Sequence, residues 1–200
     1  NLVVGSAGVR VSGGSGTDTV TNFEHLIGSN YNDWLAGNDQ SNMLDGLLGV
    51  DTLSYELAAD SVDVNLAEQR ATCDGIVDTV KNFENVVGSA YGDTLTGDKG
   101  DNVFDGRNGS DTVTYQNLKA GEGGVVVSLA ITGTQNTQGS GFDTFLAVTG
   151  KTWSSIENLT GSVNDDKLTG DAYANILDGS DGNDTLIADA GADTLSGGLG

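Results

Sequence analysis

The chain has 200 residues, of which 31 are glycine and none is proline, and 36% are hydrophobic. Acidic side chains number 29 against 8 basic ones, and the net charge of −21 argues against nucleic acid or an anionic membrane surface as partner and favours cations. The single cysteine, Cys73, excludes an internal disulfide, and no apolar run is long enough for a membrane span.

The N-terminal part of the chain contains one clear short unit. Residues 1–12 alternate weakly, which fits either a first strand or an edge facing a partner. Residues 13–21, GGSGTDTVT, follow as a glycine-rich turn with a three-residue strand. The residues NFEHLIGS follow. They form a short turn and a second strand, His25 to Ile27, and lead into a longer block.

This block recurs at fixed periods along the chain. It runs from Gly28 to Tyr55, begins again at Gly88, 60 residues later, and begins a third time at Gly161, after a further 73 residues. The copy from Gly88 divides into nine-residue units, GSAYGDTLT, GDKGDNVFD and GRNGSDTVT. Repetition of this kind is typical of solenoid proteins.

Each unit predicts a six-residue turn followed by a three-residue strand. Glycine opens the turn, where a side chain would restrict the backbone, and the eighth residue (Leu95, Phe104 or Val113) lies in the middle of the strand and should point into a core. Two units make one coil of a flattened parallel β-solenoid. We expect a single domain over residues 1–200, with repeat blocks 13–54, 75–114 and 141–200 and longer loops 55–74 and 115–140.

Counting alternate turns along the chain predicts two chemically different edges. One edge collects turns that end in aspartate, and the other collects the NFE-type turns, the long loops and the turns ending at Asn42, Asn102 and Asn175. Asp193 is the one aspartate that ends such a turn on this second edge. The expected aspartate edge consists of Asp18, Asp33, Asp51, Asp78, Asp93, Asp111, Asp143, Asp166 and Asp184.

A ladder of aspartates needs a cation to be stable. Coils lie about 4.8 Å apart, where two carboxylates repel by about 3.5 kcal/mol at an effective dielectric of 20. A hard cation between adjacent turns would bind two carboxylates and the turn carbonyls, and calcium tolerates such flexible geometry better than magnesium. We expect ions in the intervals 33–51, 93–111 and 166–184, and also in 18–33 and 78–93.

The units resemble the GGxGxDxUx nonapeptides of the repeats-in-toxin (RTX), or haemolysin-type, calcium-binding repeats. The resemblance implies a parallel β-roll with calcium held by turn carbonyls and the sixth-position aspartate. From the number of turns in this sequence we expect an all-β, right-handed roll of about nine to ten two-strand coils, holding about five to eight calcium ions. It also implies a secreted, extracellular or cell-surface bacterial protein, exported by type I secretion as part of a larger polypeptide and folded by calcium outside the cell. The predicted calcium ligands are the nine aspartates above with Asp193, Asp181 and Asn108, and the glycines Gly28, Gly46, Gly49, Gly88, Gly106, Gly109, Gly161, Gly179 and Gly182.

Two other functions remain open at this stage. A polysaccharide lyase or epimerase on a parallel β-helix needs an acidic groove with a basic partner, but the only histidine, His25, has no recurring basic neighbour and more simply fits a surface strand. A polysaccharide or cell surface is a candidate partner, since exposed aromatic residues such as Tyr31 and Tyr91 would suit adhesion. Glu24, Glu84 and Glu157 recur before equivalent strands, where we interpret them as structural caps.

Overall fold

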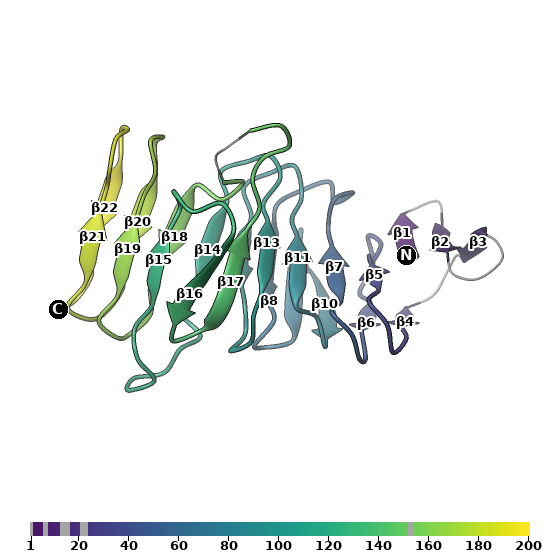
Figure 1. The fold of residues 1–200 in the computed structure, drawn as a ribbon. Coiled ribbons are helices and arrows are strands. Elements are labelled where there is room, and N and C mark those ends of the chain that lie inside the picture. Colours follow the sequence, from purple (N-terminus) through teal and green to yellow (C-terminus); the bar gives the residue numbers. More distant parts are fainter. Residues whose placement is uncertain (1, 6–7, 13–16, 21–23, 152–153) are drawn as a thin grey trace.

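The computed structural model describes residues 2–5, 8–12, 17–20, 24–151 and 154–200. This part of the chain contains strands and turns and no helix. Figure 1 shows an elongated stack of short strands that runs from the N-terminal strands to the C-terminus. The predicted all-β parallel roll is confirmed.

The strands form two faces, and the chain crosses from one face to the other through the turns. The first face consists, in spatial order, of β5 (Trp34–Leu35), β7 (Thr52–Ser54), β11 (Asn85–Val87), β13 (Val103–Asp105), β17 (Gly141–Phe145) and β16 (Thr134–Gln138), and continues in β15 (Val126–Ser128), β19 (Lys167–Thr169) and β21 (Thr185–Ile187). The second face consists of β4 (His25–Ile27), β6 (Met43–Asp45), β10 (Ile76–Lys81), β9 (Arg70–Cys73), β8 (Val62–Asn65), β12 (Thr94–Thr96), β14 (Thr112–Thr114), β18 (Asn158–Thr160), β20 (Ile176–Asp178) and β22 (Thr194–Ser196).

The middle residue of each short strand fills the core between the two faces. Leu95, at the middle of β12, pairs with Val113 of β14 in parallel register, and both side chains are fully buried. Phe104 and Phe145, on neighbouring strands of the first face, pack with ring centroids 6.2 Å apart and ring planes tilted by 57°. Burying a side chain of this size contributes about 1.5–3 kcal/mol, so the apolar eighth position of each unit stabilises its own coil.

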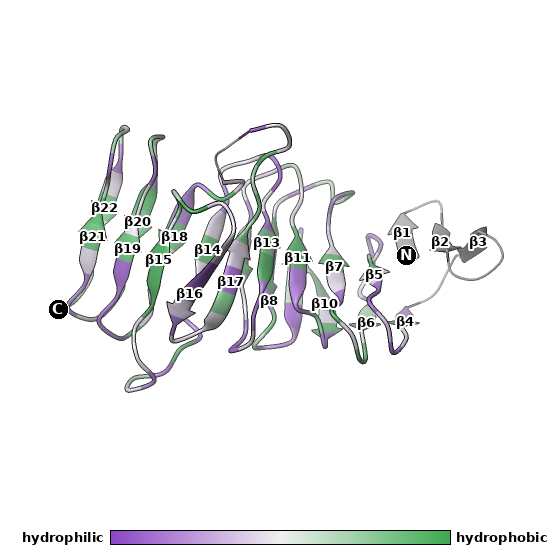
Figure 2. Cartoon of the chain, in the orientation of Figure 1, coloured by the Kyte–Doolittle hydropathy of each residue, from purple (hydrophilic) through white to green (hydrophobic). Residues whose placement is uncertain are grey.

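Two antiparallel meanders interrupt the parallel stack, one on each face. On the second face β8, β9 and β10 pair antiparallel, while β10 continues in parallel with β6 and β8 with β12. On the first face β17 and β16 pair antiparallel, and β16 lies beside β15 through the Val125–Gln138 bridge. Figure 2 shows β16 as a hydrophilic strand beside the more hydrophobic β15. The longer segments 55–74 and 115–140 thus contain strands that belong to the sheets.

The predicted division into an aspartate edge and an asparagine edge is wrong. We define rim one as the turns that lead into strands of the first face, and rim two as those that lead into the second face. Because β8, β9 and β10 all lie on one face, a 60-residue repeat makes an odd number of crossings, and successive blocks start on opposite faces. Rim one carries Asp33, Asp51, Asn102, Asp143, Asp166 and Asp184, and rim two carries Asn42, Asp78, Asp93, Asp111, Asn175 and Asp193.

The N-terminal strands do not continue the parallel stack. β1 (Leu2–Gly5) pairs with β5, while β2 (Gly8–Ser12) and β3 (Thr17–Val20) follow it in antiparallel order. Asp18 lies within β3, opposite Val11, and not at the end of a turn between parallel strands. Because β2 and β1 lie between β3 and β5, Asp18 is not next to the turn that ends at Asp33, and the expected 18–33 interval is wrong.

Candidate metal centres

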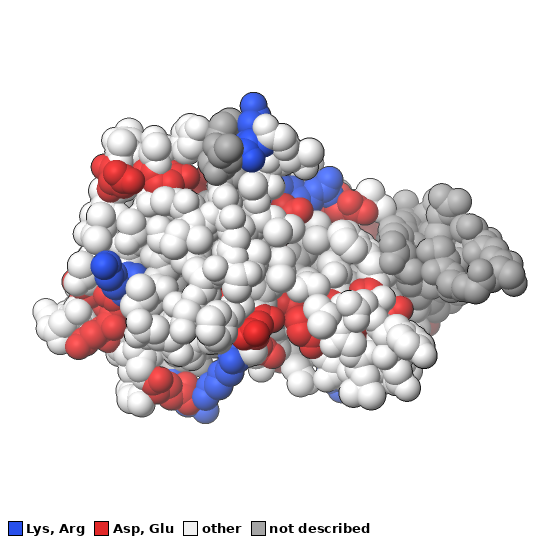
Figure 3. All heavy atoms as spheres, viewed as in Figure 1, with Lys and Arg blue, Asp and Glu red and all other residues white. Residues whose placement is uncertain are grey.

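Acidic side chains gather along the rims of the stack. In the view of Figure 3 the aspartates and glutamates lie near the upper and lower margins, and the sheet surface between them is mostly uncharged. The rim turns of the nine-residue units fall into three kinds, which differ in the partner of the side chain that ends the turn.

In the first kind, the turn closes on its own aspartate. The Ser89 N–H donates to Oδ2 of Asp93 at 2.6 Å, and its hydroxyl donates to Oδ1 at 2.7 Å. Both oxygens of the buried carboxylate thus accept a hydrogen bond from within the turn. The same Gly-Ser turn occurs at Ser29–Asp33 and Ser162–Asp166.

In the second kind, the turn closes on an asparagine. The Asp98 N–H donates to Oδ1 of Asn102 at 2.9 Å, and Asn102 Nδ2 donates to the Glu84 carbonyl at 3.2 Å. The side-chain amide of Asn102 therefore forms hydrogen bonds with its own turn and with the neighbouring coil without carrying a charge. This fits a neutral, hydrogen-bonded position. Asn42 and Asn175 accept the N–H of Asn38 and Asp171 in the same way.

The third kind of turn leaves a carboxylate oxygen without a partner. In the turn 106–111, Arg107 has a φ of 69° and donates its N–H outward to Asp105, while Gly109 has a φ of 142°, which only glycine adopts readily. Oδ2 of Asp111 is buried and has no hydrogen-bond partner. The sequence pattern of this open turn, Asp-Gly-x-x-Gly-x-Asp, and its unpaired oxygen recur at Asp51 in turn 46–51 and at Asp184 in turn 179–184.

Successive turns on one rim are joined by their aspartates. The Asp93 N–H donates to Oδ1 of Asp111 at 2.7 Å, so a closed turn stacks directly on an open one. The predicted 33–51 and 166–184 neighbours are joined in the same way, and Asn175 donates to Asp193. The expected 78–93 pair is not adjacent, because β9 and β8 lie between β10 and β12.

Burial makes these carboxylates costly to ionise. It is the largest cause that raises the pKa of Asp111 to about 8, and the neighbouring charges of Asp93 and Glu157 add to it, against the opposing hydrogen bond from the Asp93 N–H. Burial also raises the pKa of Asp51, Asp93 and Asp166. A cation bound beside these groups would offset this penalty.

The gaps between turns fit an oxygen-seeking cation. A Cβ on Gly28 would lie 2.7 Å from Oδ2 of Asp33 and 2.8 Å from the carbonyl oxygen of Gly46, so both oxygens face one point that only glycine leaves open. The same pairing of carboxylate and next-turn carbonyl occurs at Gly88 and at Gly161. Among the described residues no three His, Cys, Asp or Glu side chains come together so that they could hold a metal ion. A metal here would therefore depend largely on backbone carbonyls, which suits calcium.

The other predicted ligands lie at different places on the rims. Asn108 and Asp181 are exposed at turn tips. Gly49, Gly109 and Gly182 have positive φ and lie against the preceding turn's backbone. Gly46, Gly106 and Gly179 open the turns that end in Asp51, Asp111 and Asp184.

Asp78 and Asp143 have a different environment from the other predicted ligands. Asp78 accepts the Asn42 N–H on Oδ1 at 2.8 Å and the Tyr55 hydroxyl on Oδ2 at 2.8 Å. Asp143 is bound in the same way by the Asn102 N–H and the Tyr115 hydroxyl. Sequence reasoning missed both tyrosines as partners, although Tyr55 and Tyr115 end their blocks at the same position, which was the available signal.

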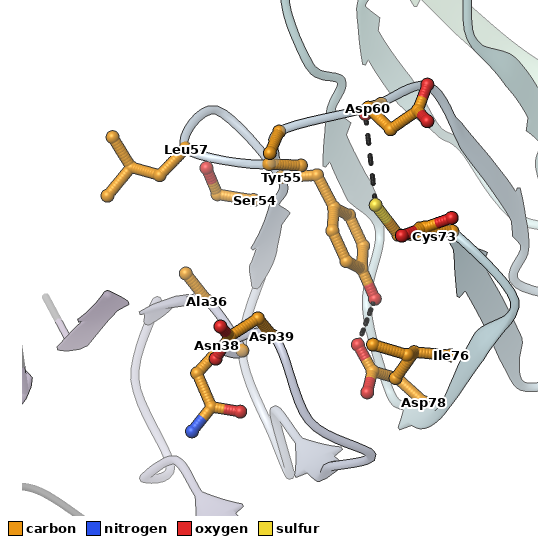
Figure 4. A pocket seen from close by; sticks show the side chains of 14 residues that line it. Ala36, Asn38, Asp39, Ser54, Tyr55, Leu57, Asp60, Cys73, Ile76 and Asp78 are labelled. Atoms are coloured by element: carbon orange, nitrogen blue, oxygen red, sulfur yellow. Dashed lines mark hydrogen bonds between the residues drawn. The ribbon is translucent and has the colours of Figure 1, made fainter. Parts of the chain in front are cut away.

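One cavity lies next to this tyrosine–aspartate pair. It has a volume of about 310 Å³ and lies between the turn that contains Asn38 and Asp39 and the start of the second-face meander. Figure 4 shows Tyr55 reaching Asp78 across it and the Cys73 thiol near the Asp60 carbonyl. Burial raises the pKa of Cys73, so its thiol stays protonated at neutral pH and is a poor nucleophile.

A family model supports the repeat pattern directly. The model of the RTX calcium-binding nonapeptide repeat matches residues 22–57, 83–114 and 169–200, which together make up half of the chain. The chain belongs to the RTX calcium-binding repeat family. RTX repeats form β-rolls that bind calcium and are not typically enzymatic, so the chain contains a structural calcium-binding module. A search of the curated proteins gave no match. The described residues include no helix that could cross a membrane.

Proposed function

We propose that this RTX module folds when it binds calcium and serves as a structural scaffold for other parts of a larger, secreted protein. The observation that carries the proposal is the set of buried, unpaired carboxylate oxygens on the open turns, at Asp51, Asp111 and Asp184. A buried carboxylate without a counter-charge destabilises a fold, and a bound cation removes that cost.

The mechanism is linkage between binding and folding. The residues that would hold calcium are the turn aspartates and the carbonyls of the following turn, such as Asp33 with Gly46. The ion would supply positive charge between coils that otherwise repel. Because these oxygens converge only when turns are stacked, calcium binds the folded chain and hardly binds the open chain, and each site adds about 2.7 kcal/mol at a hundredfold excess over its Kd.

The distribution of charge supports export before folding. With a net charge of −21 and little free calcium, carboxylate repulsion keeps the chain open, and millimolar calcium outside the cell then drives folding. We infer a secreted or cell-surface bacterial location and type I export on this basis, together with the properties of the family. Asp78 and Asp143 play a structural part in this scheme, since each lies within a strand and accepts the hydroxyl of a buried tyrosine.

Calcium titration of chelator-treated protein tests the proposal. Circular dichroism should show a cooperative change from coil to β structure, and calorimetry should count several ions per chain. Asp39→Asn, at an exposed turn position, serves as the control for Asp184→Asn, whose unpaired oxygen should be needed for tight binding. Full β content in chelator, or binding of one ion or none, would contradict the proposal.

A further inference from the structure

The two meanders share one plan, so the surroundings of the cavity can be compared with a matching region. Each meander contains a hairpin, β9–β10 or β16–β17. A turn that closes on asparagine, 37–42 or 97–102, leads into the strand on one side of the hairpin. A segment that begins with a tyrosine, 55–61 or 115–124, leads into the strand on the other side. In both segments the third residue after the tyrosine donates its N–H to the tyrosine carbonyl, so the positions match.

In the first-face meander, side chains close the space between the turn and the segment. Leu118 is 1% exposed and belongs to the core. Nδ2 of Asn117 donates to the Gly97 carbonyl at 3.2 Å, and Nζ of Lys99 forms an ion pair with Oε1 of Glu122 at 2.6 Å. An apolar side chain, a hydrogen bond and an ion pair thus fill and bridge this region.

In the second-face meander, the matching side chains leave the space open. An aspartate, Asp39, stands third in its turn, where the first-face turn has its lysine. Counted from the tyrosine, Leu57 and Ala58 stand where the other segment has its asparagine and its buried leucine. The side chain of Leu57 is 64% exposed and cannot donate a hydrogen bond to the turn. The cavity of about 310 Å³ lies where the bridging groups are missing.

The cavity combines apolar walls with acidic groups. The residues that matter here are Leu57, Ala58 and Ile76 on the apolar side, and Asp39, Asp60 and Asp74 on the acidic side. Figure 4 shows Asp39 and Leu57 on facing sides of the cavity. The lining includes no lysine or arginine, and none of the ion pairs between described residues involves these three aspartates. The cavity therefore attracts cations and has no cation of its own.

The surroundings favour an organic cation over a metal ion. The nearest turn closes on Asn42 and not on an aspartate, and no three acidic side chains of the described residues are placed to hold a metal. Apolar walls with a few polar groups, around a volume of about 300–1,000 Å³, are typical of sites for small organic molecules. A ligand that fits both sides needs a positive charge and an apolar chain.

We propose that this cavity binds an organic ammonium ion, a primary ammonium group on an apolar chain of about four carbons, as in a lysine side chain. The ammonium group pairs with Asp39, and its chain packs against Leu57, Ala58 and Ile76. The ligand supplies from outside what Lys99 supplies within the first-face meander. This site is separate from the aspartate turns assigned to calcium, so the inference goes beyond the proposed function.

Titration of the calcium-loaded chain with n-pentylammonium chloride, followed by two-dimensional NMR, tests the site. Saturable shifts should appear at the amides of residues 37–39 and 57–60. Ethylammonium should bind at least about tenfold more weakly, because each buried methylene contributes about fourfold in affinity. The uncharged 1-pentanol should also bind at least about tenfold more weakly, because it lacks the charge that pairs with Asp39. Shifts that spread along both rims without saturation would overturn the inference.

Two variants fill the cavity with the groups of the other meander. Ala58→Leu restores the leucine, and Asp39→Lys, at an exposed position, supplies an ammonium group from the chain itself. Each should weaken pentylammonium binding at least about tenfold while the circular dichroism spectrum and the number of calcium ions stay unchanged. Glu24→Gln, an exposed acid that does not line the cavity, is the control and should bind as the unaltered chain does. Undiminished binding in both variants would refute the site.

A last comparison identifies the source of the ammonium group. Butylammonium and Nα-acetyl-lysine methylamide carry the same ammonium chain, without and with a peptide backbone. Tighter binding of the first would support a free amine as the ligand, and tighter binding of the second would support a lysine side chain of another protein. Calcium binding without binding of any of these amines would overturn this inference and leave the proposed function intact.

Discussion

The buried contact between Tyr115 and Asp143 offers a direct test of how the first-face meander is held. The Tyr115 hydroxyl donates to Oδ2 of Asp143 at 3.0 Å, and the two residues are 2% and 0% exposed. Tyr115→Phe removes this donor without changing the ring. A hydrogen bond to a charged group contributes about 1.5–3 kcal/mol, and one between neutral groups about 1 kcal/mol.

The loss should depend on pH because the Asp143 carboxyl titrates. Burial is the main cause that raises its pKa to about 7, against the opposing hydrogen bonds from Asn102 and Tyr115. Since the pKa in the fold lies above that of the unfolded chain, this carboxyl favours folding below about pH 4, and that contribution is lost as the pH rises to about 7. Tyr115→Phe should therefore cost about 1 kcal/mol at pH 5, where the carboxyl is protonated, and about 2–3 kcal/mol at pH 8, where it is ionised.

Urea denaturation at saturating calcium measures this difference, with variant and unaltered protein compared at the same pH. Tyr91→Phe is the control, since Tyr91 is 48% exposed on a turn, and its loss should be small at both pH values. Equal losses for Tyr115→Phe at pH 5 and pH 8, or a loss at pH 8 no greater than that of the control, would refute this account of the contact.

Three further predictions concern the same architecture. Tyr55→Phe should cost as much as Tyr115→Phe, because Tyr55 binds Asp78 in the equivalent way, and the two losses should add in the double variant since they share no partner; urea midpoints that differ strongly would contradict this. Asn102→Ala should cost about 1 kcal/mol without changing the number of calcium ions, because its amide serves the neighbouring backbone. Asp93→Asn should instead weaken calcium binding, because it removes a charge from the 93–111 gap. Calorimetry that finds equal losses of ions in these last two variants would argue against the distinction between the turns.

Much of the fold follows from local residue patterns. The three-residue strands centred on Leu95, Phe104 and Val113 were predicted correctly, since alternation in a short strand fixes which side chain enters the core. The close 33–51, 93–111 and 166–184 neighbours were also predicted, because two nine-residue units make one coil and return the chain to the same rim. The recurring glutamates and the calcium-binding family were recognisable from the same repeats.

Other features depended on how segments distant in sequence pair. Nothing in residues 55–74 indicates that β8, β9 and β10 share one face, yet that choice makes the number of crossings odd and moves the next aspartates to the opposite rim. The partners of Asp78 and Asp143 also lie across a meander, 23 and 28 residues away. The sequence by itself thus determined the repeating coil, its core and its affinity for calcium, because these arise within one or two units. Only the tertiary structure decided which rim each carboxylate occupies and which groups of other coils contact it, because these contacts join segments that lie far apart in the sequence.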